Sequence, residues 1–260
     1  MSVDPYLKHH FGLEGQKALV TGGASGIGQA IAIALAKAGA DVGITVHSRS
    51  GDETLAMIKR AGRSGLSIAT DLAALDAAGA DLLIGKAESE FGPVSILVNN
   101  AGIIRRDNFY EHQQNDWRDV MAANLDAVWY LSQAVGKRMR ERRNGRIINI
   151  ASLLSFQGGI RVPGYTAAKH AVAGLTKAMA NELAPFGVTV NAIAPGYVAT
   201  ENTKALRADP DRSRQILERI PAGRWAEPSD LASAAIFLCA PASGYVTGQI
   251  LAVDGGWLAR

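Results

Sequence analysis

Seven short apolar runs recur along the chain, separated by longer segments in which apolar residues have helical spacing. The runs fall near residues 17–21, 41–46, 66–70, 95–99, 146–151, 188–193 and 249–253. Short apolar runs flanked by turn residues are typical of buried strands, and the segments between them are typical of helices. The alternation predicts one α/β domain over residues 1–260, with a doubly wound parallel sheet and helices on both faces.

Glycines mark the first junction between a strand and a helix, in GQKALVTGGASGIGQAIAIALAKAGA. Gly22, Gly26 and Gly28 have the spacing G-x3-G-x-G. Glycine lets the backbone turn sharply and approach a pyrophosphate, and the N-terminus of the next helix offers unpaired N–H groups. A tight turn without a ligand is the alternative. The strand before the glycines and the helix after them favour dinucleotide binding.

Other strand ends carry residues suited to the same ligand. The run 95–99 leads into Asn99–Gly102, with an Asx turn as the alternative, and the run 188–193 leads into the turn Pro195-Gly196. Asp71 follows the third run, where it could accept from an adenine amino group or cap the next helix. Ligands bind at the carboxyl ends of parallel strands, where all these residues are expected.

A phenol and an ammonium stand one helical turn apart in PGYTAAKHA. Tyr165 and Lys169 occupy positions i and i+4, which are neighbours on a helix surface. A free phenol has a pKa of about 10, so it needs a nearby cation to exchange a proton near neutral pH. Ser152, which ends the run RIINIAS, could hydrogen-bond the same substrate oxygen. The spacing predicts a proton-transfer site, with a solvated lysine on an amphipathic helix as the alternative.

Composition narrows the class of protein. With 260 residues, 48% hydrophobic and 20% charged, the chain can bury one large core. We find no apolar run long enough to span a membrane and no signal-peptide pattern at residues 1–10, so we expect a cytoplasmic protein without a membrane partner. The net charge of +3 suits an anionic cofactor and substrate, and we expect no nucleic-acid partner because the basic run 137–146 should end a helix. The lone Cys239 predicts core packing, and the scattered histidines predict no metal site.

In this order and spacing, the motifs resemble the short-chain dehydrogenase/reductase family from residue 12 onward. TGxxxGxG begins at Thr21, NNAG at Asn99 and YxxxK at Tyr165. The resemblance implies a Rossmann fold. The expected cofactor-binding residues are Gly22, Ser25, Gly26, Ile27, Gly28, Ser48, Arg49, Asp71, Leu72, Asn100, Ala101, Gly102, Tyr165, Lys169, Pro195, Gly196, Val198 and Thr200.

The same resemblance implies roles for four catalytic residues. Tyr165 is the expected general acid/base, and Lys169 is expected to lower its pKa and to hold the nicotinamide ribose. Ser152 is expected to polarise the substrate oxygen. Asn124, in MAANLDAVW, is expected to help a water connect the lysine to solvent through a helix irregularity. The alternative for Asn124 is an interior amide that binds a local backbone carbonyl.

The segment after the second run bears on the choice of cofactor. An NAD enzyme usually places an acid there to accept both ribose hydroxyls. This chain has Ser48 and Arg49 instead, which could bind a 2′-phosphate. The alternative is that Arg49 is a solvated loop residue. We therefore favour NADP(H) slightly over NAD(H).

Residues 95–260 are similar to one branch of the family, in segments such as NNAGIIRRDNF, QGGIRVPGYTAAK and VDGGWLAR. The branch contains 2-deoxy-D-gluconate 3-dehydrogenases and 2-dehydro-3-deoxy-D-gluconate 5-dehydrogenases. This resemblance implies hydride transfer between a secondary alcohol and a ketone on a sugar acid. The alternatives are a polyol, a steroid or a 3-oxoacyl thioester as substrate, or a dinucleotide sensor without catalysis.

A sugar acid needs a partner for its carboxylate. We expect substrate contacts from Ser152, Tyr165, Gln157 and Arg161, because the last two precede the tyrosine on a loop that should border the site. Arg105 and Arg106 are weaker candidates. The alternative for Arg161 is an ion pair with an acid on another subunit.

Two further segments carry expectations about the site and the assembly. Residues 200–225, here called the flap, are polar, charged and interrupted by prolines, which predicts a helical cover over the substrate or else a plain surface insertion. The family resemblance implies a homotetramer, in which helices around 107–143 and 163–184 pair between subunits. An exposed Trp257 near the chain end would then lie close to an interface.

Overall fold

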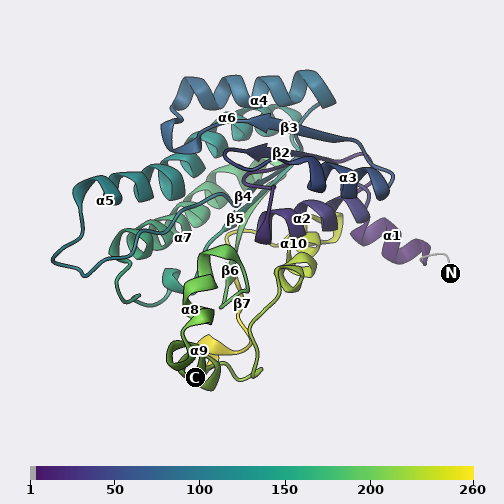
Figure 1. Ribbon diagram of the computed structural model, residues 1–260. Helices are drawn as coiled ribbons and strands as arrows, with labels where there is room; N and C mark the ends of the chain where they lie inside the picture. The colour runs from purple at the N-terminus through teal and green to yellow at the C-terminus, as the bar shows by residue number, and fades with distance from the viewer. Residues whose placement is uncertain (1–3) are drawn as a thin grey trace.

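The structure is a computed structural model that describes residues 4–260, and it shows one seven-stranded sheet between two layers of helices (Figure 1). Residues 1–3, which begin the segment without a signal-peptide pattern, therefore lie outside the described residues. All neighbouring strands are parallel, in the order β3-β2-β1-β4-β5-β6-β7. The strands are β1 (Lys17–Val20), β2 (Asp41–Val46), β3 (Gly65–Ala69), β4 (Ile96–Asn99), β5 (Gly145–Ile150), β6 (Val188–Pro195) and β7 (Ile250–Val253).

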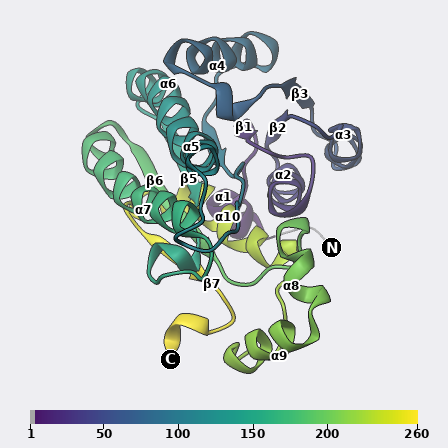
Figure 2. The ribbon, with the colours of Figure 1, turned by 60° about the vertical axis from the view of Figure 1, so that its left-hand side comes forward.

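Each strand begins and ends within two residues of its predicted position, so the α/β fold class is confirmed. Helices α2, α3 and α10 cover one face of the sheet, and α4, α6 and α7 cover the other (Figure 2). The helices are α1 (Pro5–Phe11), α2 (Gly26–Lys37), α3 (Asp52–Arg60), α4 (Ala77–Phe91), α5 (Gln114–Met121), α6 (Ala127–Arg142), α7 (Pro163–Leu183), α8 (Lys204–Ala208), α9 (Pro210–Arg219) and α10 (Ala232–Cys239).

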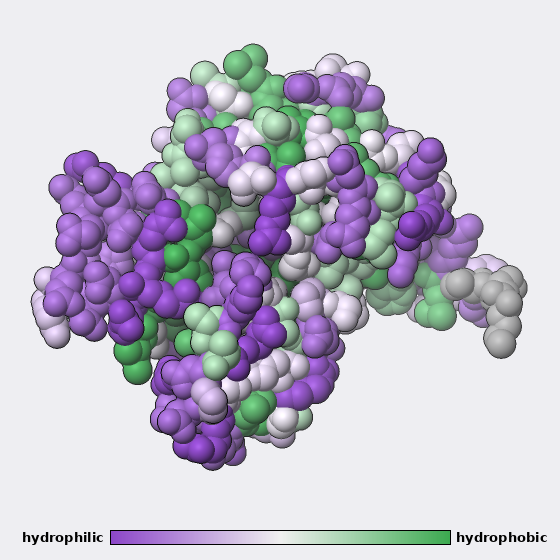
Figure 3. Space-filling model, in the orientation of Figure 1, coloured by the Kyte–Doolittle hydropathy of each residue, from purple (hydrophilic) through white to green (hydrophobic). Residues whose placement is uncertain are grey.

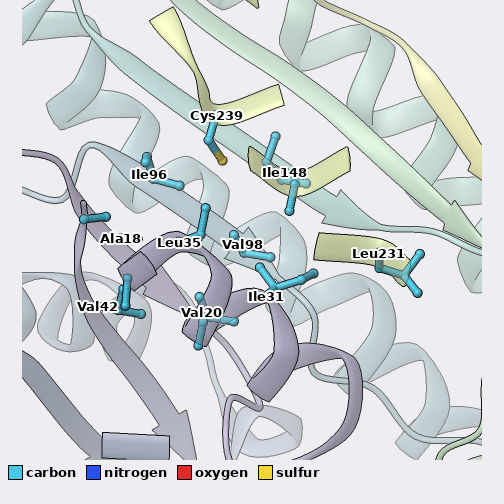
Figure 4. Packing of buried hydrophobic residues seen from close by; sticks show 14 of the residues in the cluster. Ala18, Val20, Ile31, Leu35, Val42, Ile96, Val98, Ile148, Leu231 and Cys239 are labelled. Carbon is cyan, nitrogen blue, oxygen red and sulfur yellow. The ribbon is translucent and has the colours of Figure 1, made fainter. Parts of the chain in front are cut away.

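Burial on both faces explains why the strands read as unbroken apolar runs. In β1, Ala18 and Val20 face the layer that contains α2 and α10, whereas Leu19 faces the opposite layer. Figure 4 shows the first of these cores, in which side chains of β1, β4 and β5 pack against α2 and α10. Cys239 lies in this core and is 3% exposed, as predicted.

The strand order places a crevice at the carboxyl ends of β1 and β4. From β1 the sheet grows towards β2 and β3 on one side and towards β4 on the other. At such a reversal the connections leave the sheet on opposite faces, so a gap opens between them. The expected dinucleotide motifs follow the two strands that border this gap.

The flap is helical, as its sequence predicts. It contains the short 3-10 helix η5 (Glu201–Thr203), then α8 and α9, and it projects below the sheet edge in Figure 1. The expectation of an exposed Trp257 is wrong, because Trp257 is 4% exposed and packs against Ile216 and Ile220 beneath the flap. No helix within residues 4–260 is long and apolar enough to cross a membrane.

Candidate active site

A cavity of about 1860 Å³ opens at the carboxyl edge of the sheet. Its walls come from the segments after β1, β2, β3, β4, β5 and β6 and from the flap. Figure 3 shows the opening as a hollow between the α5 side of the molecule and the flap. Apart from Gly28, every residue predicted for the catalytic, cofactor or substrate site lines this cavity.

Gly28 has a packing role rather than a direct place in the cavity wall. A Cβ atom at this position would lie 2.4 Å from both the Asn100 Nδ2 and the Gly22 carbonyl oxygen. Gly22 and Gly26 have the left-handed φ values of +64° and +57° that favour glycine. The glycine loop, residues 22–28, can therefore turn tightly only if position 28 carries no side chain.

The NNAG segment holds the glycine loop in place. Thr21 Oγ1 accepts hydrogen bonds of 2.9 Å from the backbone N–H groups of Asn100 and Ala101. The Asn100 side chain donates in return to the Thr21 carbonyl at 2.9 Å. The amide that we expected to contact a ligand thus binds backbone, and it fixes the distance between the ends of β1 and β4.

The glycine loop has the features of a phosphate cradle. Ser25 is the N-cap of α2 and lines the cavity. Its side chain makes no capping hydrogen bond in the described chain, so its hydroxyl is available to a ligand. Ile27 and the first N–H groups of α2 follow directly. A helix N-terminus with free donors binds an anion such as a pyrophosphate. These residues fit a dinucleotide.

The end of the cavity beyond β2 carries a cation. Ser48 and Arg49 are exposed and line the cavity, and among residues 4–260 Arg49 forms no ion pair. Asp71 borders the same region, but its side chain caps the short helix η1 (Leu72–Ala74) by accepting from the Ala73 N–H at 3.0 Å. The capping alternative for Asp71 is therefore present in the structure, with Leu72 beside it in the wall.

Tyr165, Lys169 and Ser152 lie close together in the wall of the cavity. Helix α7 carries the first two, and Ser152 follows β5. The Lys169 Nζ lies 5.4 Å from the centroid of the Tyr165 ring and donates to the Ile150 carbonyl at 2.6 Å. Ser152 Oγ accepts from the Leu154 N–H at 3.1 Å. Because that bond occupies a lone pair of the serine oxygen, the hydroxyl proton is free to point at Tyr165 or a ligand.

Burial dominates the acidity of both groups on α7. It raises the pKa of Tyr165, whereas the hydrogen bond with Ser152 and the charge of Arg106 lower it. Burial also lowers the pKa of Lys169 to about 8. We expected Lys169 to lower the pKa of Tyr165. In the structure Ser152 and Arg106 lower this pKa, and burial raises it by more than these two groups lower it.

Asn124 lies in the π-helical turn η2 (Ala122–Asp126) between α5 and α6. Its side-chain nitrogen donates to the carbonyls of Ile103 at 2.9 Å and Val120 at 2.8 Å. Its Oδ1 is buried and has no partner in the described part of the chain. Both interpretations of Asn124 are thus compatible with the structure: it binds backbone carbonyls, and it keeps one acceptor for a water at an irregular turn.

The arginines near the expected substrate end differ in their partners. Arg105 pairs with Asp116 at 3.3 Å and with Asp119 at 3.6 Å. Arg106 donates to the backbone carbonyl of Asn202 in the flap at 2.9 Å. Arg161 is exposed at the rim of the cavity, with a left-handed φ of 64° and its carbonyl bound by the Asp107 N–H. Arg106 alone is close enough to Tyr165 to affect its pKa.

The sequence did not indicate several cavity residues from the last third of the chain. Arg212 and Arg219 on α9 line the cavity, and their charges lower the pKa of Tyr197, which burial raises. Arg212 and Arg219 are seven residues apart, which is about two helical turns, and this spacing indicates that they share one face of α9. Trp257 also lines the cavity, and its indole N–H meets Gln157 at 3.3 Å. Within residues 4–260, no three His, Cys, Asp or Glu side chains cluster as a metal site would require.

Comparison with known proteins agrees with this geometry. A family model described as enoyl-(acyl carrier protein) reductase matches residues 22–258. The 2-dehydro-3-deoxy-D-gluconate 5-dehydrogenase of Dickeya dadantii is 52% identical over 251 residues, which cover 96% of this chain and 98% of that protein.

Solved structures also match over almost the whole chain. A candidate 2-deoxy-D-gluconate 3-dehydrogenase of Agrobacterium tumefaciens with bound NADP is 54% identical, with a TM-score of 0.89 over 96% of this chain and 99% of that one. A gluconate 5-dehydrogenase of Burkholderia cenocepacia in complex with NADP and tartrate is 38% identical, with a TM-score of 0.90 over 97% and 99% of the two chains.

The buried ammonium of Lys169 should make stability depend on pH. Its pKa of about 8 in the fold is below the ordinary value of 10.5, so the unfolded chain binds the proton more tightly. Below pH 8 Lys169 is protonated in both the folded and the unfolded state, so the free-energy cost of burying its charge is fully present. Above pH 10.5 Lys169 is neutral in both states, and this cost is absent. We expect the free energy of unfolding of the wild type, relative to Lys169→Met, to rise by about 3 kcal/mol between these limits.

Urea unfolding of the coenzyme-free proteins at several pH values between 7.5 and 11 measures this difference. Lys177→Met provides the control, because Lys177 is exposed on the same helix. Its curve should stay parallel to that of the wild type. A Lys169→Met curve that is also parallel would show that the ammonium keeps its ordinary pKa.

Proposed function

Because the chain belongs to the short-chain dehydrogenase/reductase family, we propose that it is an NAD(P)-dependent oxidoreductase of sugar-acid metabolism. The reaction interconverts a secondary alcohol and a ketone on a deoxy or keto sugar acid of the 2-deoxy-D-gluconate or 2-dehydro-3-deoxy-D-gluconate type. The observation that carries this proposal is the meeting of Tyr165, Ser152 and Lys169 in one cavity with a phosphate cradle and Arg106.

In this proposal the chain's own residues handle the proton. Ser152 donates to the substrate carbonyl, since the Leu154 N–H already fills an acceptor site of its oxygen. The raised pKa keeps Tyr165 protonated at neutral pH, so the phenol can donate a proton to the same oxygen during reduction. Ser152 and the charge of Arg106 stabilise the phenolate that remains. Lys169, with a pKa of about 8, is still mostly charged at pH 7. Bound NAD(P)(H) supplies or takes up the hydride.

The return of the proton to Tyr165 needs a route from solvent. We propose that the free Oδ1 of Asn124 holds a water at the π-helical turn, which connects Lys169 to solvent. A buried carbonyl oxygen without a protein partner is a suitable site for an ordered water. The donors of the same side chain are already bound to Ile103 and Val120, so its orientation is fixed.

For the cofactor we propose a preference for NADP(H) over NAD(H). Ser48 and Arg49 would hold the 2′-phosphate, because Arg49 is not neutralised by an ion pair in the described chain and reaches the cavity. The glycine loop would hold the pyrophosphate, and Lys169 the nicotinamide ribose. Two similar proteins were solved with bound NADP, which supports the proposal without comparing the two nucleotides. The other predicted contacts are Asp71, Leu72, Ala101, Gly102, Pro195, Gly196, Val198 and Thr200.

For the substrate carboxylate we propose Arg106 as the main partner, with Arg161 at the rim as a second one. Arg105 is less suitable because two aspartates already pair with it. Among the described residues, Arg106 is held only by a backbone carbonyl of the flap, so its charge is still available to an anion. Tartrate in a similar protein shows that a carboxylate-bearing molecule can bind in that relative.

The alternatives are less well supported. An acyl thioester or a steroid would bring a long apolar group into a cavity lined by Arg106, Arg161, Arg212 and Arg219, where those charges would lose solvation. A sensor without catalysis would not require Ser152 hydrogen-bonded to Tyr165.

On the basis of the family resemblance we also propose a single domain over residues 1–260 that works as a homotetramer in the cytoplasm. Trp117 on α5 and Trp129 on α6 are each 42% exposed, which suits the proposed pairing of these helices between subunits. The flap, residues 200–225, is proposed to cover the bound substrate.

Replacement of Tyr165 by Phe tests the proposed chemistry. The wild type should reduce NADP⁺ or NAD⁺, seen as absorbance at 340 nm, with at least one candidate sugar acid. Tyr165→Phe should lower turnover by at least about two orders of magnitude, since it removes the proton donor with little change in volume. Tyr130→Phe, which alters a partly buried tyrosine that packs against the core away from the cavity, should keep near-native rates. A folded Tyr165→Phe protein with native turnover contradicts the assignment.

Charge reversal at Arg49 tests the cofactor proposal. Arg49→Glu should weaken NADPH binding about tenfold or more, and NADH binding far less, because a charged hydrogen bond becomes a repulsion. Titration of both nucleotides into both proteins measures this. Arg60→Glu makes the same change of net charge at the exposed end of α3 and should leave both affinities unchanged. Equal losses for the two nucleotides, or a wild type that prefers NADH, would refute the preference.

Two arginine variants test the partner of the substrate carboxylate. Arg106→Met should raise KM for the acid by roughly ten- to a hundredfold, the scale of a charged hydrogen bond, and Arg161→Met should raise it less. A neutral analogue that lacks the carboxylate should be almost unaffected. Steady-state kinetics with both substrates separate charge recognition from a loss of flap contacts. Parallel losses for acid and analogue would give Arg106 a structural role only.

A further inference from the structure

One contact joins the last helical turn of the chain to the substrate end of the cavity. Trp257, in the 3-10 helix η8 (Trp257–Ala259), donates from its indole Nε1 to the Oε1 of Gln157 at 3.3 Å. Gln157 lies in the segment between Ser152 and α7. Both side chains line the cavity, although Trp257 is only 4% exposed. The function proposed above assigns no role to Trp257.

The chemistry of the two groups determines which way the amide of Gln157 points. An indole has one N–H donor and no acceptor, whereas a glutamine amide has an oxygen that accepts and an NH₂ group that donates. The oxygen of Gln157 must therefore face Trp257, because the opposite orientation would place two donors against each other. The amide nitrogen then turns away from Trp257, and within residues 4–260 it makes no hydrogen bond. Its two donors are available to a ligand in the cavity.

The surroundings of Trp257 hold its ring in this position. The Tyr197 ring packs on it with centroids 4.8 Å apart, and the Arg219 guanidinium lies 3.9 Å from its ring centroid. The turn before it is fixed by Asp254, whose two carboxylate oxygens accept from the Gly256 and Leu258 N–H groups, each at 2.9 Å. A packed and hydrogen-bonded ring can impose its direction on a more flexible glutamine.

We propose that Trp257 is a positioning residue that presents the NH₂ of Gln157 to an acceptor oxygen of the substrate, such as its carboxylate. This rests on the proposed sugar-acid function and adds a determinant of specificity to it. Substrates with an oxygen acceptor at this place gain a hydrogen bond from a preoriented donor. Trp257 itself does not touch the reacting atoms; it acts through Gln157.

A double-mutant cycle tests whether Trp257 acts through Gln157. Trp257→Phe keeps an aromatic ring and removes the N–H, so the amide can turn over, and KM for the sugar acid should rise about three- to tenfold with kcat within twofold of the wild type. In a Gln157→Leu background the same substitution should change KM by less than about twofold. Trp225→Phe is the matched control, because Trp225 belongs to the same cluster and packs on Tyr197, but its indole N–H makes no hydrogen bond in the described chain. Trp225 is the last residue of the flap and, unlike Trp257, does not line the cavity. Trp225→Phe should leave KM unchanged.

A second measurement does not depend on turnover. In ¹⁵N spectra of protein labelled at tryptophan, the Trp257 indole signal, identified by its loss in Trp257→Phe, should shift in Gln157→Leu, whereas the Trp225 signal should not. An unchanged Trp257 signal overturns the inference whatever the enzyme catalyses. So does a KM effect of Trp257→Phe that is equally large in the Gln157→Leu background. If the wild type turns over no sugar acid but the Trp257 signal still shifts in Gln157→Leu, the proposed function is refuted. The role of Trp257 is then limited to orienting the Gln157 amide.

Discussion

The close approach of two backbone turns at Gly28 is the constraint on which the rest of the site depends. The ends of β1 and β4 border the gap where the sheet reverses direction, and Thr21 and Asn100 bind each other's segments there. This lock forms only because position 28 has no side chain to separate Gly22 from Asn100. The next contact along the same edge is similar: Gly102 lies against the π-helical turn, where a Cβ atom at position 102 would be 2.4 Å from the Asn124 Oδ1.

Much of the fold and part of the site could be predicted from the sequence because they depend on local patterns. Strands buried on both faces give unbroken apolar runs, and a Tyr–Lys pair four residues apart must share a helix face. The partners of individual side chains could not be predicted in this way. Asn100 binds backbone and Trp257 is buried. Within the described chain, aspartates pair with Arg105 but not with Arg106. Each of these depends on segments far apart in the sequence.

The acidity of the central groups shows the same limit. The sequence places a cation next to a phenol, but it does not show how far both are removed from water. Burial raises the pKa of Tyr165 and lowers that of Lys169, so the two pKa values lie further apart in the fold than they do in water. Both shifts favour the neutral form of the side chain, and for Tyr165 this is the form that can donate a proton.

The π-helical turn has a consequence for the long helical segment that contains it. α5 packs against α7, whereas α6 packs mostly against α4 and to a lesser extent against α7, so the two halves of this segment present different faces to these neighbours. Each residue advances an α-helix by about 100°, since a turn has about 3.6 residues. The wider turn at residues 122–126 changes this rotational phase partway along the segment. The same irregular turn contains Asn124, whose buried Oδ1 has no partner in the described chain, and it lets a nearly continuous helical segment fit two different neighbours.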